Sequence, residues 1–398
     1  MGVDLRYGAS NSLTLEFSSD QTAAFASLDV ESIDGPLREV VHASLDQSTH
    51  FPAFREIVFP EDTLAIAIGE GIPQIAEIVA SVIDYIQTYT EVAIEDITIV
   101  FPNELTASVE SQLKELLDEF VFSTLTFEVH NPAISEELAY LTATQEGDPI
   151  RINKTLVDSD VVLPICLNLP ETLFGYAGFF HDLFPLYTET ETILRFRSSL
   201  DLETLKRDST EAANMLGVQY LLKVTPANGE AIHNITAGDI FTLQNSAHSI
   251  ASGNWSHAMS ESDLTIGSIS GTQHQQTWDN LARALATLAK ATSAGGAMVI
   301  CSELTGPLPA PIKLLSSNDA QQQLAEQLKQ QPDADIQAAQ EILQLRSDYH
   351  IYLLSELIGE DVESIGLAHI ESPTQINNLI AAAQKVNCVA DAHRVAVI

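Results

Sequence analysis

Leu64-Ala-Ile-Ala-Ile68 is followed at once by Gly69-Glu-Gly-Ile-Pro73, and a second apolar run, Ile97-Thr-Ile-Val-Phe101, comes further along the chain. Both runs are almost wholly apolar, which is typical of strands in a sheet that is covered on both faces. Between them, apolar side chains recur at helical spacing from residue 75 to residue 86. Strand, loop, helix and strand in this order predict a βαβ unit with parallel strands.

The same alternation continues along the chain. We expect a helix over Val109 to Phe120 and strands over Leu125 to Val129 and Asp160 to Leu167. A second set is a strand at 263–266, a helix at 278–291, a turn at Gly295-Gly296 and a strand at 297–301. The glutamine-rich stretch from Gln321 to Gln340 keeps helical spacing, which predicts one exposed helix.

The length of the chain predicts two domains, because 398 residues exceed the roughly 100–200 residues of an ordinary domain. Hydrophobic residues make up 45% of the chain, enough to fill two cores. We expect an N-terminal α/β domain over residues 1–262 and a C-terminal α/β domain over 263–398. Each would be built on a largely parallel sheet, with a cleft between the domains.

The chain is strongly acidic, with 55 Asp and Glu against 18 Lys and Arg and a formal charge of -37. A surface so negative repels phosphate backbones and anionic lipid headgroups, so we expect no nucleic-acid or membrane partner. A small-molecule ligand remains as the expected partner, and the oligomeric state is left open. An anionic ligand would need local relief from this field, which makes each arginine near a cleft informative.

The cysteines and the apolar runs indicate a cytoplasmic protein. Cys166, Cys301 and Cys388 lie in apolar stretches without metal-ligand spacing, as buried free thiols do in a reducing compartment. No apolar run reaches the roughly 18 residues that span a membrane, and the first residues do not read as a signal peptide.

Ligands of open α/β sheets bind outside the carboxyl ends of the strands. Glu70 follows the strand that ends at Ile68, and His130 follows the strand that ends at Val129. Trp278 and Arg283 lie on the predicted helix that would line the other side of the cleft. We therefore expect these four side chains to contribute to substrate binding, although Trp278 could equally anchor its own helix.

The segment from Leu169 to Pro185, followed by Glu191-Thr-Ile193, resembles the nickel-dependent lactate racemase family. The family's segment is roughly P-H-x-F-A-G-F-S-G-G-x-K-x-x-L-P-G, followed by E-T-I-x-x-N-H. Pro170, Gly175, Tyr176 and Pro185 fall on matching positions without a gap, and Leu5-Arg-Tyr-Gly8 is similar to the family's opening. The resemblance implies a lactate-racemase-like fold of two α/β domains.

The residues that carry the family's chemistry are replaced in this sequence. The resemblance implies that Glu171 stands in the position of the family's proton-transferring histidine. His181 stands in the position of the lysine that tethers the pyridinium cofactor, and Arg197 in that of a histidine that binds nickel. Other replaced positions are the phosphate-gripping loop (Glu70-Gly-Ile-Pro73), the second catalytic histidine (Pro102-Asn103) and a late lysine (Ala282). A guanidinium keeps its charge and is no ordinary metal ligand. These replacements argue against the nickel-pincer nucleotide, and any other cofactor is unknown.

The resemblance implies roles for the residues that remain. Glu171 and His181 are the candidate acid-base pair, Arg197 is the candidate grip for a substrate carboxylate, and Tyr176 is a candidate binding residue. No residue is predicted to bind a metal. The plainer alternatives are a solvated carboxylate at Glu171, a structural imidazole at His181 and a surface ion pair at Arg197.

Three functions follow from this set. The first is a lactate-racemase-like isomerase, a racemase or epimerase, that acts on a small 2-hydroxy acid or related carboxylate without the nickel-pincer site. The second is a non-catalytic protein that binds a small molecule in the same cleft. The third is a nickel-pincer racemase or epimerase with rearranged ligands.

Overall fold

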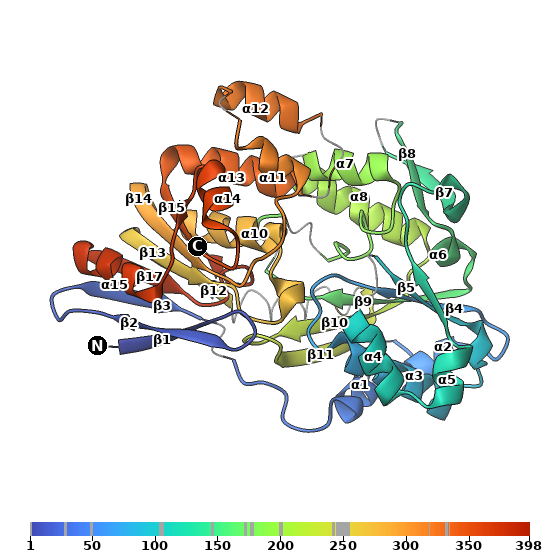
Figure 1. Cartoon of the computed structure of the whole chain (residues 1–398). Coiled ribbons are helices and arrows are strands. Elements are labelled where there is room, and N and C mark those ends of the chain that lie inside the picture. The colour runs from blue at the N-terminus through green and yellow to red at the C-terminus, as the bar shows by residue number, and fades with distance from the viewer. Residues whose placement is uncertain are drawn as a thin grey trace.

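Figure 1 shows the computed structural model of the chain. It describes residues 2–27, 30–47, 51–102, 107–144, 147–170, 173–175, 179–198, 202–240, 243, 255–317, 319–330, 333 and 335–398. Two six-stranded sheets dominate the architecture, and helices cover them (Figure 1). The prediction of an α/β fold with two largely parallel sheets is therefore confirmed.

The first sheet has the strand order β11-β10-β9-β4-β5-β6. Its strands are β4 (Leu64–Ile68), β5 (Ile97–Phe101), β6 (Thr126–Val129), β9 (Val161–Leu167), β10 (Tyr220–Pro226) and β11 (Ile232–Asp239). All neighbours pair in parallel except β10 and β11. Every residue of β4 is buried, because apolar side chains cover both faces of this central strand.

Helices cover the two faces of the first sheet. The elements around it are α1 (Leu37–Asp46), α2 (Phe54–Ile57), α3 (Ile75–Tyr89), α4 (Ala107–Leu116), α5 (Glu119–Thr124), α6 (Lys154–Asp158), α7 (Thr190–Ser198) and α8 (Leu202–Met215), with the hairpin β7 (Leu138–Ala143) and β8 (Pro149–Asn153). Side chains of α1, α3 and α4 share one core with Ile66 and Ile68. Ala65 and Ala67 face a second core that includes Phe180, Leu183 and Tyr187. The segment after β9 therefore packs onto the sheet itself.

The second sheet has the order β16-β15-β14-β13-β17-β3 and is parallel throughout. Its strands are β3 (Thr22–Ala26), β13 (Ser262–Ser268), β14 (Thr292–Cys301), β15 (His350–Leu354), β16 (Ala368–His369) and β17 (Lys385–Val389). The helices around it are α10 (Trp278–Ala289), α11 (Ala310–Leu314), α12 (Gln321–Leu328), α13 (Ile336–Asp348), α14 (Gly359–Ser364) and α15 (Pro373–Ala382). A short pair, β12 (Ser256–His257) and β18 (Ala396–Val397), completes the strands of this part.

The start of the chain packs with its end. The hairpin β1 (Gly2–Tyr7) and β2 (Asn11–Glu16) lies beside the second sheet, and β3 forms the edge of that sheet next to β17 (Figure 1). Leu5, Leu13 and Leu15 belong to the same core as Ile266 and Cys388. Residues 2–26 thus pack with the part of the chain that was predicted as domain 263–398. The exact domain limits, 1–262 and 263–398, stay a prediction.

Several predicted elements differ in the structure. The helix expected over Val109 to Phe120 is two helices, because the Asp118 carboxylate accepts from the Phe120 N–H and starts α5. The stretch Gln321 to Gln340 also divides, into α12 and α13, and much of α13 is buried. The buried free thiols predicted at the three cysteines are confirmed.

Gly295-Gly296 lies inside β14 and is not a turn before it. Thr292 pairs with Ser262 and Ala297 pairs with Leu264. An advance of five residues along β14 therefore corresponds to an advance of two residues along β13. The extra residues form a bulge in the strand. A Cβ atom at Gly296 would lie 2.8 Å from the Ser293 carbonyl oxygen and 3.0 Å from that of Asp263.

The carboxyl ends of the two sheets meet at the junction, by which we mean residues 69–74, 227–231, 269–277 and 390–395. The loop after β4 accepts a hydrogen bond at Gly71 O from Gln275 Nε2, at 3.0 Å. The turn after β10 accepts at Gly229 O from Arg394 Nη1, at 2.6 Å. None of the described helices is long and apolar enough to cross a membrane.

The bulge in β14 generates a test with adjacent substitutions. Gly295 has φ +76 and no neighbour within 4 Å of an added Cβ, so asparagine, which tolerates this conformation, should cost less than about 1 kcal/mol there. Gly296→Asn should cost about 1–3 kcal/mol, because its Cβ meets backbone oxygens that cannot move freely. Urea unfolding of both variants measures the difference, and equal losses would contradict the bulge.

Candidate functional site

The structure describes only part of the predicted loop site. Glu171 and Tyr176 lie outside the described residues, and so does the side chain of Arg197, whose backbone belongs to α7. His181 is described and is partly buried, next to Asp182. The Thr188 hydroxyl donates to Pro185 O at 2.7 Å, and α7 begins two residues later, at Thr190. The roles predicted for Glu171, Tyr176 and Arg197 stay predictions.

Asp182 holds the ends of two strands together. Its Oδ2 atom accepts from the Leu167 N–H at the end of β9, at 2.6 Å, and its carboxylate also accepts from the Glu70 N–H just after β4. Asp182 is 4% exposed. Gly69 leaves room for it, since an added Cβ would lie 2.7 Å from Asp182 Cγ. His181 is thus carried on a segment that is clamped to the carboxyl edge of the first sheet.

Burial is the main influence on the pKa of the Asp182 carboxyl. It raises the pKa of Asp182 to about 6, while the charge of Lys223 and the Leu167 N–H act in the opposite direction. A carboxyl with such a pKa exchanges its proton near neutral pH, as acid-base groups of enzymes do. The hydrogen bonds to Leu167 and Glu70 also make it a clamp, so the raised pKa alone does not define a catalytic role.

Lys223 is a functional candidate that the sequence analysis missed. It lies in the middle of β10, is fully buried, and donates from Nζ to Phe179 O at 2.5 Å and to Leu167 O at 3.2 Å. The ammonium also lies 4.6 Å from the centre of the Phe179 ring. The available signal was a lysine within the otherwise apolar run from Tyr220 to Val224. Charged residues are rarely placed in a buried strand without a partner.

Tyr187 links the carboxyl ends of β4 and β5 by hydrogen bonds and packs against His130, which follows β6. Its hydroxyl accepts from Ile68 N at 2.9 Å and lies 2.6 Å from Val100 O, to which it donates. Its ring centre is 5.6 Å from that of His130. His130 Nε2 lies 3.0 Å from Thr188 O, so it carries the proton, and the buried Nδ1 atom has no partner among the described residues. Burial lowers the pKa of His130, which keeps the ring neutral.

The second sheet contributes Arg283 and Trp278 from α10. Arg283 Nε donates to Phe174 O at 3.0 Å, so the guanidinium reaches the described stretch 173–175 of the predicted loop. Trp278 is 5% exposed and belongs to the core of the second sheet. Its contacts favour the anchoring role over ligand binding. The structure therefore brings Glu70, His130 and the 179–187 segment to one edge, with Arg283 reaching the same loop from the other sheet.

The donor atoms do not fit a nickel-pincer cofactor. An imidazole at His181 cannot form the amine-derived bond that the resemblance implies for that position, and a guanidinium at Arg197 does not ligate nickel. Among the described residues, no three His, Cys, Asp or Glu side chains are grouped so that they could hold a metal ion. We derive no step through nickel, and the absence of a metal site stays a prediction.

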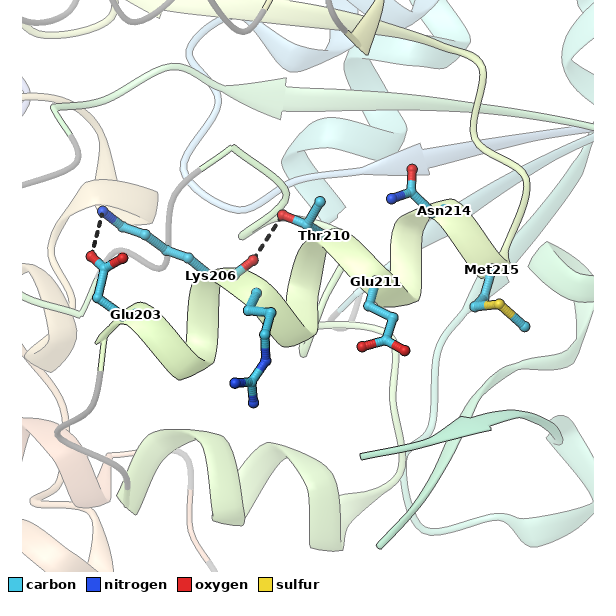
Figure 2. A pocket seen from close by; sticks show the side chains of 7 residues that line it. Glu203, Lys206, Thr210, Glu211, Asn214 and Met215 are labelled. Carbon is cyan, nitrogen blue, oxygen red and sulfur yellow. Dashed lines mark hydrogen bonds and ion pairs between the residues drawn. The ribbon is translucent and has the colours of Figure 1, made fainter. Parts of the chain in front are cut away.

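Two concave surfaces among the described residues lie away from this edge. One is a groove of about 460 Å3 along α8, and all its lining side chains come from that helix (Figure 2). The other measures about 600 Å3 and lies at the amino ends of β4, β5 and β9; it is lined by Thr63, Glu95, Asp96, Thr98, Glu128, Val129, Glu136, Glu137, Lys154, Thr155, Asp158 and Ser159. Its acidic lining would repel an anion. Neither surface contains a predicted site residue.

The fold and the site define an open α/β protein with a group of ionisable side chains at the facing carboxyl edges of two largely parallel sheets. Residues 7–199 match the family model described as the lactate racemase N-terminal domain. This segment therefore belongs to the lactate racemase N-terminal domain family, as the resemblance had indicated. No curated protein matches the sequence of this chain.

Solved structures extend the similarity over the whole chain. The lactate racemase apoprotein from Thermoanaerobacterium thermosaccharolyticum superimposes with a TM-score of 0.82 at 16% identity, covering 100% of each chain. A protein from Thermotoga maritima has a TM-score of 0.69 at 12% identity, over 92% of this chain and 99% of that one. At these identities the likeness shows a shared fold and nothing about substrate.

Asp182 generates a prediction for the pH dependence of stability. Its pKa rises from the usual 3.8 to about 6 on folding, so its contribution to stability is present below about pH 4 and is lost as the pH rises through about 6. The loss amounts to about 3 kcal/mol. Asp182→Asn should remove this pH dependence. The difference in the free energy of unfolding between wild type and variant, measured with urea, should therefore change between pH 4 and pH 7.

Asp160→Asn is the matched control. Hydrogen bonds from Thr63 lower the pKa of the exposed Asp160 carboxyl, so its contribution is lost as the pH falls, which is the opposite sign. A flat difference for Asp182→Asn from pH 4 to pH 7 would contradict the raised pKa.

Lys223 generates the next prediction, because its charge lowers the pKa of Asp182. Lys223→Met should move the midpoint of the Asp182 transition above its wild-type position, as seen in the same unfolding series. The exposed Lys154→Met serves as control and should leave the midpoint in place. A midpoint that does not move, or moves to lower pH, would rule out the interaction.

Proposed function

We propose that this chain binds a small 2-hydroxy acid or a related carboxylate where the carboxyl edges of its two sheets meet. The observation that carries the proposal is the reach of Arg283 from the second sheet to Phe174, in the loop segment of the first. A cation at this place reduces the repulsion that an anionic ligand would meet from a chain of formal charge -37. A guanidinium also matches a carboxylate with two parallel hydrogen bonds.

The reaction class that fits the proposed ligand is racemisation or epimerisation, an isomerase activity. His181 would exchange a proton with the substrate, because an imidazole changes its charge near neutral pH. Glu171 would serve as the opposite base and Arg197 would share the carboxylate with Arg283, as the resemblance suggests. The Asp182 clamp supports this assignment, because it fixes the backbone from which His181 projects. Any cofactor and the predicted cytoplasmic location stay open.

Binding without turnover is the second candidate. It is favoured by the contacts of the ionisable groups, several of which are held by backbone atoms: Asp182 by Leu167 N, His130 by Thr188 O and Arg283 by Phe174 O. Such contacts hold the side chains in a fixed arrangement that can bind a ligand. They also occupy the atoms that would exchange a proton with it. The two candidates share a ligand and differ in whether it is recovered unchanged.

The test combines binding with chiral analysis. Purified protein is titrated calorimetrically with D- and L-lactate, 2-hydroxybutyrate and malate, and incubated with each in deuterated water. We expect saturable binding of at least one acid; deuterium at its C2 atom and loss of optical purity identify the isomerase, and unchanged acid identifies the binding protein. Failure of all these acids to bind would refute the proposal.

Two variants assign the roles. Arg283→Gln should weaken binding about 10–100-fold, because a charge-assisted hydrogen bond is lost, while Arg38→Gln on the surface should leave it unchanged. His181→Ala should reduce deuterium exchange by at least about 100-fold with little effect on binding. Exchange that persists in His181→Ala would exclude His181 as the acid-base group.

A further inference from the structure

The segment after β17 places two basic side chains inside the junction. His393 and Arg394 lie between β17 and β18, and each is 1% exposed. Arg394 Nη1 donates to Ala227 O at 3.3 Å and to Gly229 O at 2.6 Å, in the turn after β10 of the first sheet. The guanidinium is therefore held at a defined place where the carboxyl ends of both sheets meet.

One edge of this guanidinium has no partner. In the described part of the chain, Nε and Nη2 of Arg394 are buried and make no hydrogen bond. These two nitrogens form the edge that binds a carboxylate or phosphate through two parallel hydrogen bonds. The third nitrogen, Nη1, is the one already bound to the carbonyl oxygens, so the guanidinium is oriented with its free edge presented.

His393 adds further unused hydrogen-bonding atoms. Both ring nitrogens are buried without a partner among the described residues. Burial and the charges of Arg394 and Arg283 hold the pKa of His393 well below its usual range, so the ring is neutral and offers one N–H. Buried polar atoms are almost always satisfied, and a group of four unsatisfied ones calls for an explanation.

The neighbouring carboxylates are occupied elsewhere. Asp391 accepts from Ser270 N at 3.2 Å, from the Ser270 hydroxyl and from the Gly229 backbone. Glu230 Oε1 accepts from Thr272 N at 2.8 Å and from Thr272 Oγ1 at 3.0 Å. Both acids balance the charge of Arg394, yet neither makes a hydrogen bond to its Nε or Nη2 atom.

We propose that Arg394 and His393 form a buried subsite for an oxyanion, with the two oxygens of a carboxylate or phosphate on Arg394 Nε and Nη2 and a further hydrogen bond from His393. This subsite lies near Arg283, whose charge acts on both side chains, but it does not rest on the function proposed for Arg283 and His181. Because both side chains are 1% exposed, we expect association of the anion to be slow.

Equilibrium dialysis with labelled inorganic phosphate and, separately, labelled acetate tests the subsite at constant ionic strength in chloride. We expect saturable binding of one equivalent of at least one anion by the full chain. Phosphate alone identifies a phosphate subsite, and acetate identifies a carboxylate subsite. If neither anion shows saturable binding, the proposal is overturned.

Variants locate the binding. Arg394→Lys keeps the charge but loses the paired donors, so we expect at least a ten-fold loss of affinity, whereas Arg38→Lys on the surface should change nothing. His393→Phe keeps the hydrogen bonds from Arg394 to Ala227 O and Gly229 O and should weaken anion binding several-fold. This variant decides the matter if Arg394→Lys does not fold. Arg283→Gln, which should weaken the binding of 2-hydroxy acids, should keep saturable binding of the anion, and this outcome separates the subsite from the proposed function. Unchanged affinity in His393→Phe and in folded Arg394→Lys would overturn the assignment.

Discussion

Parallel pairing places the carboxyl ends of all strands at one edge of a sheet, and the rest of this molecule depends on that constraint. Each of its two sheets has such an edge, and the loops after β4, β10, β13 and β17 meet there. Loops carry backbone groups that no ladder satisfies, so side chains must satisfy them. Gln275 and Arg394 do this across the junction, which joins the sheets through polar contacts and leaves ionisable groups between them.

The distribution of positive charge follows from the same constraint. The chain has only 18 Lys and Arg against 55 Asp and Glu, yet Lys223 and Arg394 are fully buried at or near the carboxyl edges, and Arg283 is partly buried there. Burial of a charge is costly unless hydrogen bonds and opposite charges compensate it. Carbonyl oxygens and the carboxylates of Asp182, Asp391 and Glu230 provide that compensation. Scarce cations thus lie where an anionic ligand would need them.

The relation to the lactate racemase family holds for the backbone over the full chain and for the sequence over residues 7–199. The chemistry at individual positions is a separate matter, because a fold can be kept by packing residues while the side chains at its strand ends change. His181 shows this well. It lies on a segment whose apolar residues, including Phe180 and Leu183, pack on the first sheet, and its own side chain is not part of that core.

The sequence by itself determined six strands of the two sheets and their parallel direction, because apolar runs such as Leu64 to Ile68 and the helical spacing after them are local patterns. It also placed Glu70 and His130 at strand ends. Only the tertiary structure decided that residues 2–26 join the second sheet through β3, that Lys223 lies beside the Asp182 segment, and that Arg394 reaches the turn after β10. These contacts join residues far apart in the chain, and their partners are set by packing, which no local pattern encodes.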